Sequence, residues 1–231
     1  MKTNTAPMHP ERYYHIYNRG INGEQLFKQE RNYTYFLAQY AKYIEPIATT
    51  YAYVLMGNHF HFLLKTRTEV EICENLRRTT TTFGEVQNLP EGMSANDNNL
   101  SDGKKEKTIE QLINHQFAKL FNSYAQAINK QEKRTGALFE ESFRRKVVDS
   151  EAYAAQMVYY IHYNSKKHKF VDDFKTYPYS SYRAFLQTNF TRLPREEVFD
   201  WFGGKSTFLA YHGEQQDFAE DWADTNWIEF D

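Results

Sequence analysis

The chain contains a single cysteine, Cys73, among its 231 residues. One cysteine excludes an internal disulfide and any zinc site built from several cysteines, and it fits a reducing compartment such as the cytoplasm. No stretch approaches about eighteen consecutive apolar residues, so the sequence predicts no membrane-spanning helix and no membrane partner. Residues 1–10 are polar and lack the apolar segment of a secretion signal, which also favours a cytoplasmic location.

The composition, with 41% hydrophobic and 25% charged residues, is that of a folded chain with a sizeable core. The net charge of −2 conceals an asymmetry, because residues 211–231 contain seven acids and neither Lys nor Arg. Without those seven, 28 basic residues face 23 acidic ones, so residues 1–210 carry a charge of +5. We expect either a solvated acidic tail or one that competes with nucleic acid for the basic body. The 18 Tyr and 18 Phe are compatible with stacking on unpaired bases, although most are expected in the core.

Hydrophobic periodicity predicts strands over 13–18, 49–56, 59–66 and 144–148, and helices over 29–44, 69–83, 108–132 and 151–164. Ser150 is placed to cap the last helix, and Gly57 and Asn58 form either a tight turn or a bulge. Residues 84–107 form a polar loop insertion, and 194–209 a short helical appendage. Two strand connections are too short for parallel pairing, so we expect an α+β fold in which an antiparallel sheet carries helices on one face. The expected division is one domain over 1–186 and a C-terminal appendage over 187–231.

The chemistry begins with His59-Phe60-His61 in the third predicted strand. Side chains alternate along a strand, so both imidazoles lie on one face and could converge on a cation. By itself the motif is weak, because a bare His-x-His is more often a half-buried core histidine beside one that faces water.

Tyr160 and Asn164 add to this pattern, because four residues apart on a helix makes them neighbours on one face. A phenol oxygen can attack phosphorus, and an amide oxygen can join a metal shell. Taken singly, Asn164 could merely cap the helix. Together with the histidine pair, the residues form a constellation suited to phosphodiester cleavage. His162 turns away from Tyr160 on the helix and is expected to pack in the core.

Five short motifs occur in a defined order at residues 14–20 (YHIYNRG), 56–64 (MGNHFHFLL), 136–140 (GALFE), 160–164 (YIHYN) and 177–182 (YPYSSY). In this set the chain, from about residue 13 to 186, resembles the REP-associated tyrosine transposases of the insertion-sequence-200-like group of single-tyrosine HUH transposases. The resemblance implies a ferredoxin-like antiparallel sheet and an enzyme that cuts single-stranded DNA at the foot of a hairpin.

In that family, the tyrosine matching Tyr160 attacks the scissile phosphate and leaves a 5′-phosphotyrosyl link and a free 3′-OH. The residues matching His59, His61 and Asn164 hold Mg²⁺ or Mn²⁺, which polarises a phosphoryl oxygen. A free tyrosine has a pKa near 10, so its deprotonation must be eased, and the cation is the candidate. The chain departs from the family pattern at Ser165, where proline is common. The insertion at 84–107 and the residues after 186 have no clear counterpart.

Basic residues near these motifs are candidate contacts to DNA phosphates. They are Arg19, Lys130, Lys133, Arg134, Arg144, Arg145, Lys146, Lys166, Lys167 and Lys169. We therefore expect a DNA-binding transposase-like enzyme, as monomer or homodimer, whose partner is single-stranded or hairpin DNA. The alternative is an inactive or domesticated relative that binds repeat hairpins without cleaving them. A His-x-His metal hydrolase on a (β/α)₈ barrel is disfavoured, because the chain is short and eight strand–helix units are not visible.

Overall fold

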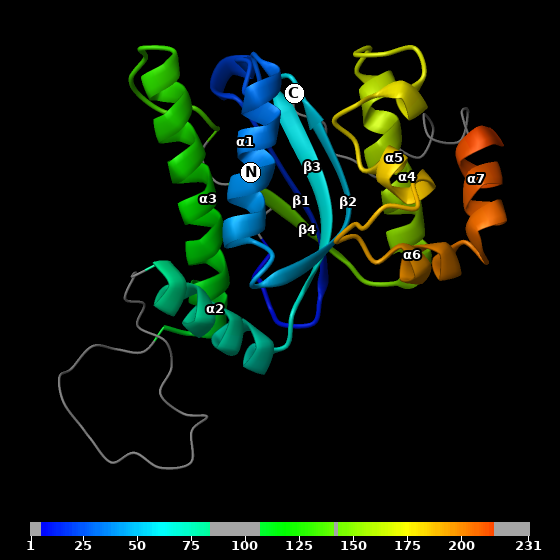
Figure 1. Cartoon of the computed structure of the whole chain (residues 1–231), viewed down its shortest axis with the longest axis horizontal. Helices are drawn as coiled ribbons and strands as arrows, with labels where there is room; N and C mark the ends of the chain where they lie inside the picture. The colour runs from blue at the N-terminus through cyan, green and yellow to red at the C-terminus, as the bar shows by residue number, and fades with distance from the viewer. Residues whose placement is uncertain (1–5, 84–106, 141–142, 215–231) are drawn as a thin grey trace.

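The computed structural model describes residues 6–83, 107–140 and 143–214. Its centre is a four-stranded antiparallel sheet made of β1 (Tyr13–Arg19), β2 (Ala48–Met56), β3 (His59–Thr66) and β4 (Arg144–Val148). The strands lie in the order β2-β3-β1-β4, so the two central strands are β3 and β1 (Figure 1). The α+β class and the antiparallel sheet predicted from the sequence are confirmed. The strand order, with a helix between β1 and β2 and another before β4, is also that of a ferredoxin-like sheet.

The turn between β2 and β3 is a two-residue hairpin at Gly57 and Asn58, because Met56 pairs directly with His59. The irregularity in this strand pair lies instead near the start of β2, between Thr50 and Ala52. The carbonyl of Asn58 accepts a hydrogen bond from the Gly20 N–H at 2.8 Å, which fixes the end of β1 beside the turn. This end of the sheet holds the candidate site.

One face of the sheet is covered by α1 (Glu30–Tyr43) and α3 (Ile109–Gln131), with α2 (Glu69–Phe83) below them in Figure 1. Thr108 caps α3, its side chain accepting a hydrogen bond from Gln111 N. Alternate residues of the central strands point into this core. Its buried side chains include Tyr14, Ile16, Phe60, Phe62 and Leu64 from the strands and Phe36, Tyr40, Phe117, Leu120 and Tyr124 from the helices.

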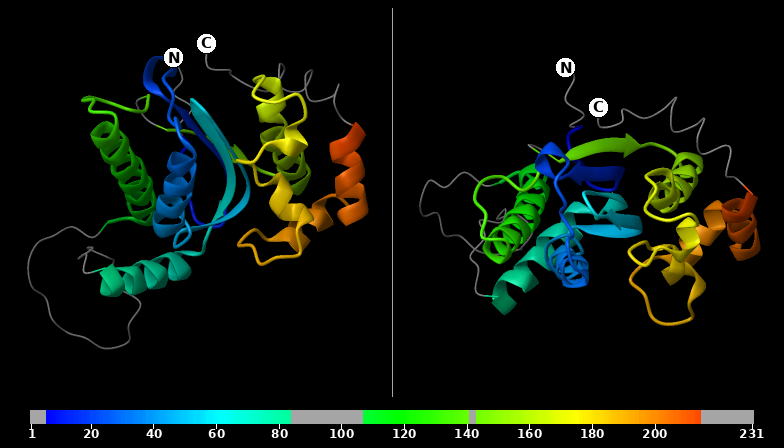
Figure 2. Two further views of the ribbon diagram at one scale, coloured as in Figure 1. Left: turned by 45° about the horizontal axis from the view of Figure 1, so that its top comes forward. Right: turned by 90° about the horizontal axis from the view of Figure 1, so that it is seen from above.

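The opposite face is covered by α4 (Glu151–Lys167), α5 (Tyr182–Leu186), α6 (Arg195–Trp201) and α7 (Lys205–Glu214). Figure 2 shows the sheet between the two helical layers. The expectation of helices on one face therefore needs correction, because a second buried core joins this face to α4 through residues such as Val54 and Met157. The physical reason lies in β2 and β3, where consecutive residues such as Leu63 and Leu64 are both fully buried, which a sheet allows when both faces are covered.

The bounds predicted for the four strands and the four long helices agree with the structure to within about a residue, except at the end of α4. That helix was expected to end at Asn164, but it continues to Lys167, and His168 is the C-cap, its N–H bonded to the Asn164 carbonyl at 2.9 Å. Ser165 explains the extension, since it supplies the backbone N–H that proline would lack. Ser150 caps the start of α4 as predicted, accepting a hydrogen bond from Tyr153 N.

The expected helical appendage consists of two helices, α6 and α7. Both contribute to the core beside α4, through Val198, Phe199 and Phe208 among others. The boundary at residue 186 stays a prediction. The expected insertion over 84–107 and the acidic tail over 211–231 lie outside the described residues, apart from 107 and 211–214. Within the part of the chain that the structure describes, every helix is too short or too polar to cross a bilayer.

Candidate active site

Two imidazoles begin β3, and both lie on the sheet face that α4 covers. The ring centroids of His59 and His61 are 5.3 Å apart, with the ring planes at 83°. Phe60, between them, is buried in the core on the opposite face, as the period of two predicts. His59 is 5% exposed and His61 4% exposed, so neither is the solvent-facing histidine of the simpler interpretation.

Both rings are held in the neutral form that binds metals. Burial lowers the pKa of His59 to about 3, and the nearby positive charges of His168 and Arg19 contribute in the same direction. Burial likewise holds the pKa of His61 well below its ordinary value. The Nδ1 atom of His59 lies 2.7 Å from Oδ1 of Asn58, an atom that only accepts hydrogen bonds. His59 therefore carries its proton on Nδ1, which leaves the lone pair on Nε2.

Asn164 is fully buried on α4, one helical turn after Tyr160. Its Nδ2 donates to the carbonyl of Tyr160 at 2.7 Å, one turn earlier in the helix. This bond settles the amide orientation, because a carbonyl oxygen accepts only from the NH₂ group. Within the described ranges, neither Oδ1 of Asn164 nor Nε2 of His61 has a hydrogen-bond partner. Two buried polar atoms without partners are costly in a protein interior unless a ligand completes them.

These donors fit a divalent cation. The three predicted ligands supply two ring nitrogens and one amide oxygen, a mixed set that suits Mn²⁺ better than the all-oxygen preference of Mg²⁺. Among the described residues, no group of three or more His, Cys, Asp or Glu side chains is arranged to hold a metal. A cation at this place would therefore depend on the Asn164 oxygen as a third protein ligand.

The phenol of Tyr160 faces the same imidazoles. Its ring centroid lies 6.0 Å from that of His61 and 6.2 Å from that of His15, edge to face in both pairs. The neighbouring tyrosines of α4 are engaged elsewhere, since Tyr159 stacks on Tyr163 and both pack against Phe174. The spacing of four residues places Asn164 one turn after Tyr160 on α4, and the Tyr160 ring itself faces His61.

The structure adds two histidines that the sequence analysis did not assign to the site. His15 on β1 is fully buried, and its Nε2 lies 2.9 Å from Nδ1 of His61. His168 lies at the end of α4, with its ring centroid 4.6 Å from that of His59. His168 follows Asn164 by four residues, a helical spacing that could have revealed it. Detecting His15 required the pairing register of β1 with β3, which the sequence does not give.

The basic segment of β4 is divided between the two sheet faces. Arg144 and Lys146 pair with Tyr17 and His15 of β1, so they lie on the site face. Arg145 points to the opposite face, where its Nη1 donates to Oδ1 of Asn114 at 3.0 Å. Arg145 is thus placed apart from the catalytic candidates, and the other two are placed beside them.

The remaining basic candidates lie around the turn end of the sheet. Arg19 is opposite His59 in the strand pairing and forms an ion pair with Glu140, Nε to Oε1, at 2.5 Å. Lys166, Lys167 and Lys169 follow the candidate ligand Asn164 at the end of α4. On the other helical layer, Lys130 and Lys133 are exposed near the end of α3, and Arg134 forms an ion pair with Glu24 at 3.0 Å.

A second histidine cluster has a structural role. His162 Nε2 lies 2.8 Å from Oγ of Ser181, and its Nδ1 lies 3.0 Å from Nε2 of His212. The order Ser–His–His resembles a nucleophile with its base, but all three side chains are fully buried, and Ser181 Oγ already accepts a bond from Tyr53 N. The contact between His162 and His212 joins α4 to α7. His162 is therefore a core residue, as predicted.

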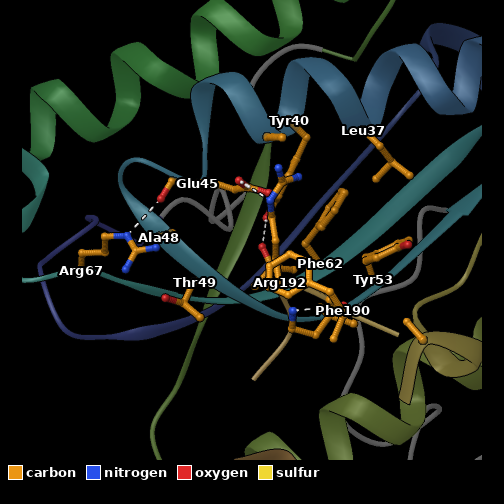
Figure 3. Close-up of a pocket in the computed structure, with 15 residues that line it drawn as sticks. Leu37, Tyr40, Glu45, Ala48, Thr49, Tyr53, Phe62, Arg67, Phe190 and Arg192 are labelled. Atoms are coloured by element: carbon orange, nitrogen blue, oxygen red, sulfur yellow. Dashed lines mark hydrogen bonds and ion pairs between the residues drawn. The ribbon is translucent and has the colours of Figure 1, made fainter. Parts of the chain in front are cut away.

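A cavity of about 740 Å³ lies elsewhere, along the β2 edge between α1 and residues 190–193 (Figure 3). Its lining includes Tyr40 and Phe190, and an ion pair of Arg192 with Glu45 at 3.3 Å. It contains none of the histidines, Tyr160 or Asn164. The chemistry-bearing residues therefore define the candidate site.

Comparison with known proteins gives little beyond shape. No family model matches the chain, and no curated protein matches it. Among solved structures, a match covers 79% of this chain and 82% of a chain described as a REP-associated tyrosine transposase bound to a REP hairpin. The identity is 12% and the TM-score is 0.49. Because this likeness is distant, the function has to be argued from the site itself.

Proposed function

We propose that this protein is a transposase-like enzyme that cuts and rejoins single-stranded DNA beside a hairpin, through a 5′-phosphotyrosine at Tyr160. The observation that supports the proposal is a set of four buried groups on β3 and α4, two elements that pack against each other and lie far apart in sequence. The imidazoles of His59 and His61 come from β3, and the Tyr160 ring on α4 faces that of His61. Asn164, also on α4, has an amide oxygen without a hydrogen-bond partner among the described residues.

The reaction is a transesterification that needs no nucleotide cofactor. The Tyr160 oxygen forms a bond to the scissile phosphorus, the bond from phosphorus to the 3′ oxygen breaks, and the phenol proton is released as the 3′ oxygen gains one. The phosphodiester is exchanged for a protein–DNA ester of the same type, so a 3′-OH can reverse the step and join strands. Helix α4 fixes the phenol toward the imidazoles, which favours one direction of attack.

His59, His61 and Asn164 would hold Mn²⁺ or Mg²⁺, and such a cation would stabilise charge on a phosphoryl oxygen and ease loss of the phenol proton. The protein residues prepare for this in the resting state. His59 is oriented by Asn58, and Asn164 is oriented by the backbone of its own helix. Arg144 and Lys146, on the site face, would grip neighbouring phosphates.

A second candidate function, binding hairpin DNA without cleaving it, is favoured by the burial of the nucleophile. Tyr160 is only 5% exposed, so most of its side chain is covered by the protein itself. At the surface beside His59, the exposed His168 and Phe170 bring their rings to 4.6 and 6.3 Å from the His59 ring. An inactive relative would retain the basic surface and this covered tyrosine.

The test is incubation with labelled hairpin oligonucleotides from the flanks of the protein's own gene, with Mn²⁺, followed by denaturing electrophoresis. We expect a covalent protein–DNA band with wild-type protein and none with Tyr160→Phe, which should still bind the hairpin. Tyr159→Phe is the matched control and should form the band. Cleavage by Tyr160→Phe would exclude the proposed nucleophile, and hairpin binding without any wild-type band would favour the second candidate. If the wild type still cleaves DNA in excess EDTA, or if His59→Ala still cleaves it, the reaction does not depend on the proposed metal.

A further inference from the structure

His15 contacts the proposed metal ligand His61, although it is not a proposed ligand itself. It lies on β1, fully buried, and its ring is parallel to that of His61 within 2°. The contact between His15 Nε2 and His61 Nδ1 is 2.9 Å, a normal hydrogen-bond length. At this distance one nitrogen donates its hydrogen and the other accepts it, so a single proton lies between the two rings.

Two arrangements of that proton are possible. If His15 donates from Nε2, His61 must carry its own proton on Nε2, the atom proposed to face the cation. If His61 donates from Nδ1, its Nε2 carries a lone pair, and His15 carries its own proton on Nδ1. A lone pair in that place can be completed by a cation, whereas an N–H there would repel one.

We propose that His15 is a positioning residue that accepts the hydrogen bond from His61 Nδ1 and thereby keeps His61 Nε2 unprotonated for a divalent cation. The inference deepens the proposed function and rests on it. With this assignment each imidazole donates a hydrogen bond from Nδ1, His59 to the Asn58 oxygen and His61 to His15 Nε2. Such outer partners fix the tautomer and ring orientation of metal-binding histidines.

His15 also contacts the proposed nucleophile. Its ring stacks on that of Tyr17 at a centroid distance of 4.8 Å, and the ring of Tyr160 meets it edge to face at 6.2 Å. A substitution must therefore separate loss of the acceptor from loss of packing. His15→Phe keeps a flat ring in this stack but removes the acceptor, whereas His15→Gln can place an oxygen near the position of Nε2.

The first measurement is made without metal. In protein labelled with ¹⁵N-histidine and held in EDTA, long-range ¹H–¹⁵N correlation spectra report which nitrogen of each ring carries the proton. We expect His61 to be protonated on Nδ1 in the wild type and in His15→Gln, and to lose this tautomer preference in His15→Phe. Protonation of His61 on Nε2 in the wild type would overturn the inference, whatever the protein does to DNA.

The second measurement is the affinity for Mn²⁺, followed by electron paramagnetic resonance. His15→Phe should weaken binding by about 10- to 100-fold, and His15→Gln should remain within about threefold of the wild type. Equal affinity of His15→Phe and wild type, or equal loss in both variants at matched thermal stability, would overturn the inference. A wild-type protein that binds no Mn²⁺ would refute the metal in the proposed function, and the metal-free spectra would still decide the role of His15.

Discussion

Acid should destabilise this protein before most of its carboxylates are protonated, because several histidines are buried in the neutral form. Burial lowers the pKa of His15, His59 and His212 to about 3, against about 6.5 in an unfolded chain. Below pH 6.5 the unfolded chain therefore binds protons that the folded protein excludes. The stability is fully present above pH 6.5 and is lost as the pH falls toward 3.

The expected size follows from the three pKa values. At pH 5 each ring is about 1.5 pH units below its unfolded pKa, which costs about 2 kcal/mol at about 1.36 kcal/mol per unit. Together the three rings cost about 6 kcal/mol, and burial acts on His61 and His162 in the same direction. A domain of ordinary stability, about 5–15 kcal/mol, would lose a large part of it.

The assay is urea unfolding at pH 7.5 and pH 5.0 in EDTA, followed by circular dichroism and tryptophan fluorescence. Carboxylates are mostly ionised at both values, and a variant that removes one histidine separates the contribution of that ring from theirs. The matched variant is His212→Asn, which can keep the bond to the Phe208 carbonyl but cannot titrate. It should reduce the pH-dependent loss by about 2 kcal/mol. A wild-type loss below about 1 kcal/mol, or an unchanged loss in the variant, would refute the reasoning.

Two further predictions concern the backbone and the basic surface. A Cβ on Gly20 would lie 2.0 Å from a backbone carbonyl oxygen, whereas one on Gly57 meets the end of a flexible glutamine side chain. In urea unfolding, Gly20→Ala should therefore cost about 2 kcal/mol or more and Gly57→Ala less than about 1 kcal/mol, and equal costs would contradict the close approach. For hairpin DNA, a double variant with Arg144→Gln and Lys146→Gln should reduce the steepness of log affinity against log salt by about 1 to 2, while Arg145→Gln leaves it unchanged. Equal slopes for the wild type, the double variant and Arg145→Gln, measured by fluorescence anisotropy, would contradict the division of β4 between the two faces.

The parts of the site that were predictable from the sequence are those set by local periodicity. Alternation along β3 placed His59 and His61 on one face, and the spacing of four residues on α4 placed Tyr160 beside Asn164. The same alternation separates Arg145 from its neighbours, although the sequence analysis grouped all three basic residues. Helical spacing would likewise have identified His168.

What the sequence could not supply is pairing between distant segments. The bond of His15 to His61 depends on the register in which Tyr17 lies opposite His61, and nothing local in either strand fixes it. The second helical layer was missed for a related reason. Leu63 and Leu64 belong to a continuous apolar run, which signals burial on both faces but was interpreted as a one-sided strand.

The most direct test of the account is to map the covalent adduct on the protein. After reaction with a hairpin oligonucleotide and Mn²⁺, nuclease and trypsin digestion should leave a nucleotide on the peptide covering residues 147–166, which contains four of the tyrosines. Fragmentation by mass spectrometry should place the nucleotide on Tyr160. Attachment to Tyr159 or Tyr163 would contradict the proposed site, because these two rings stack on each other, and Tyr163 also packs against Phe174.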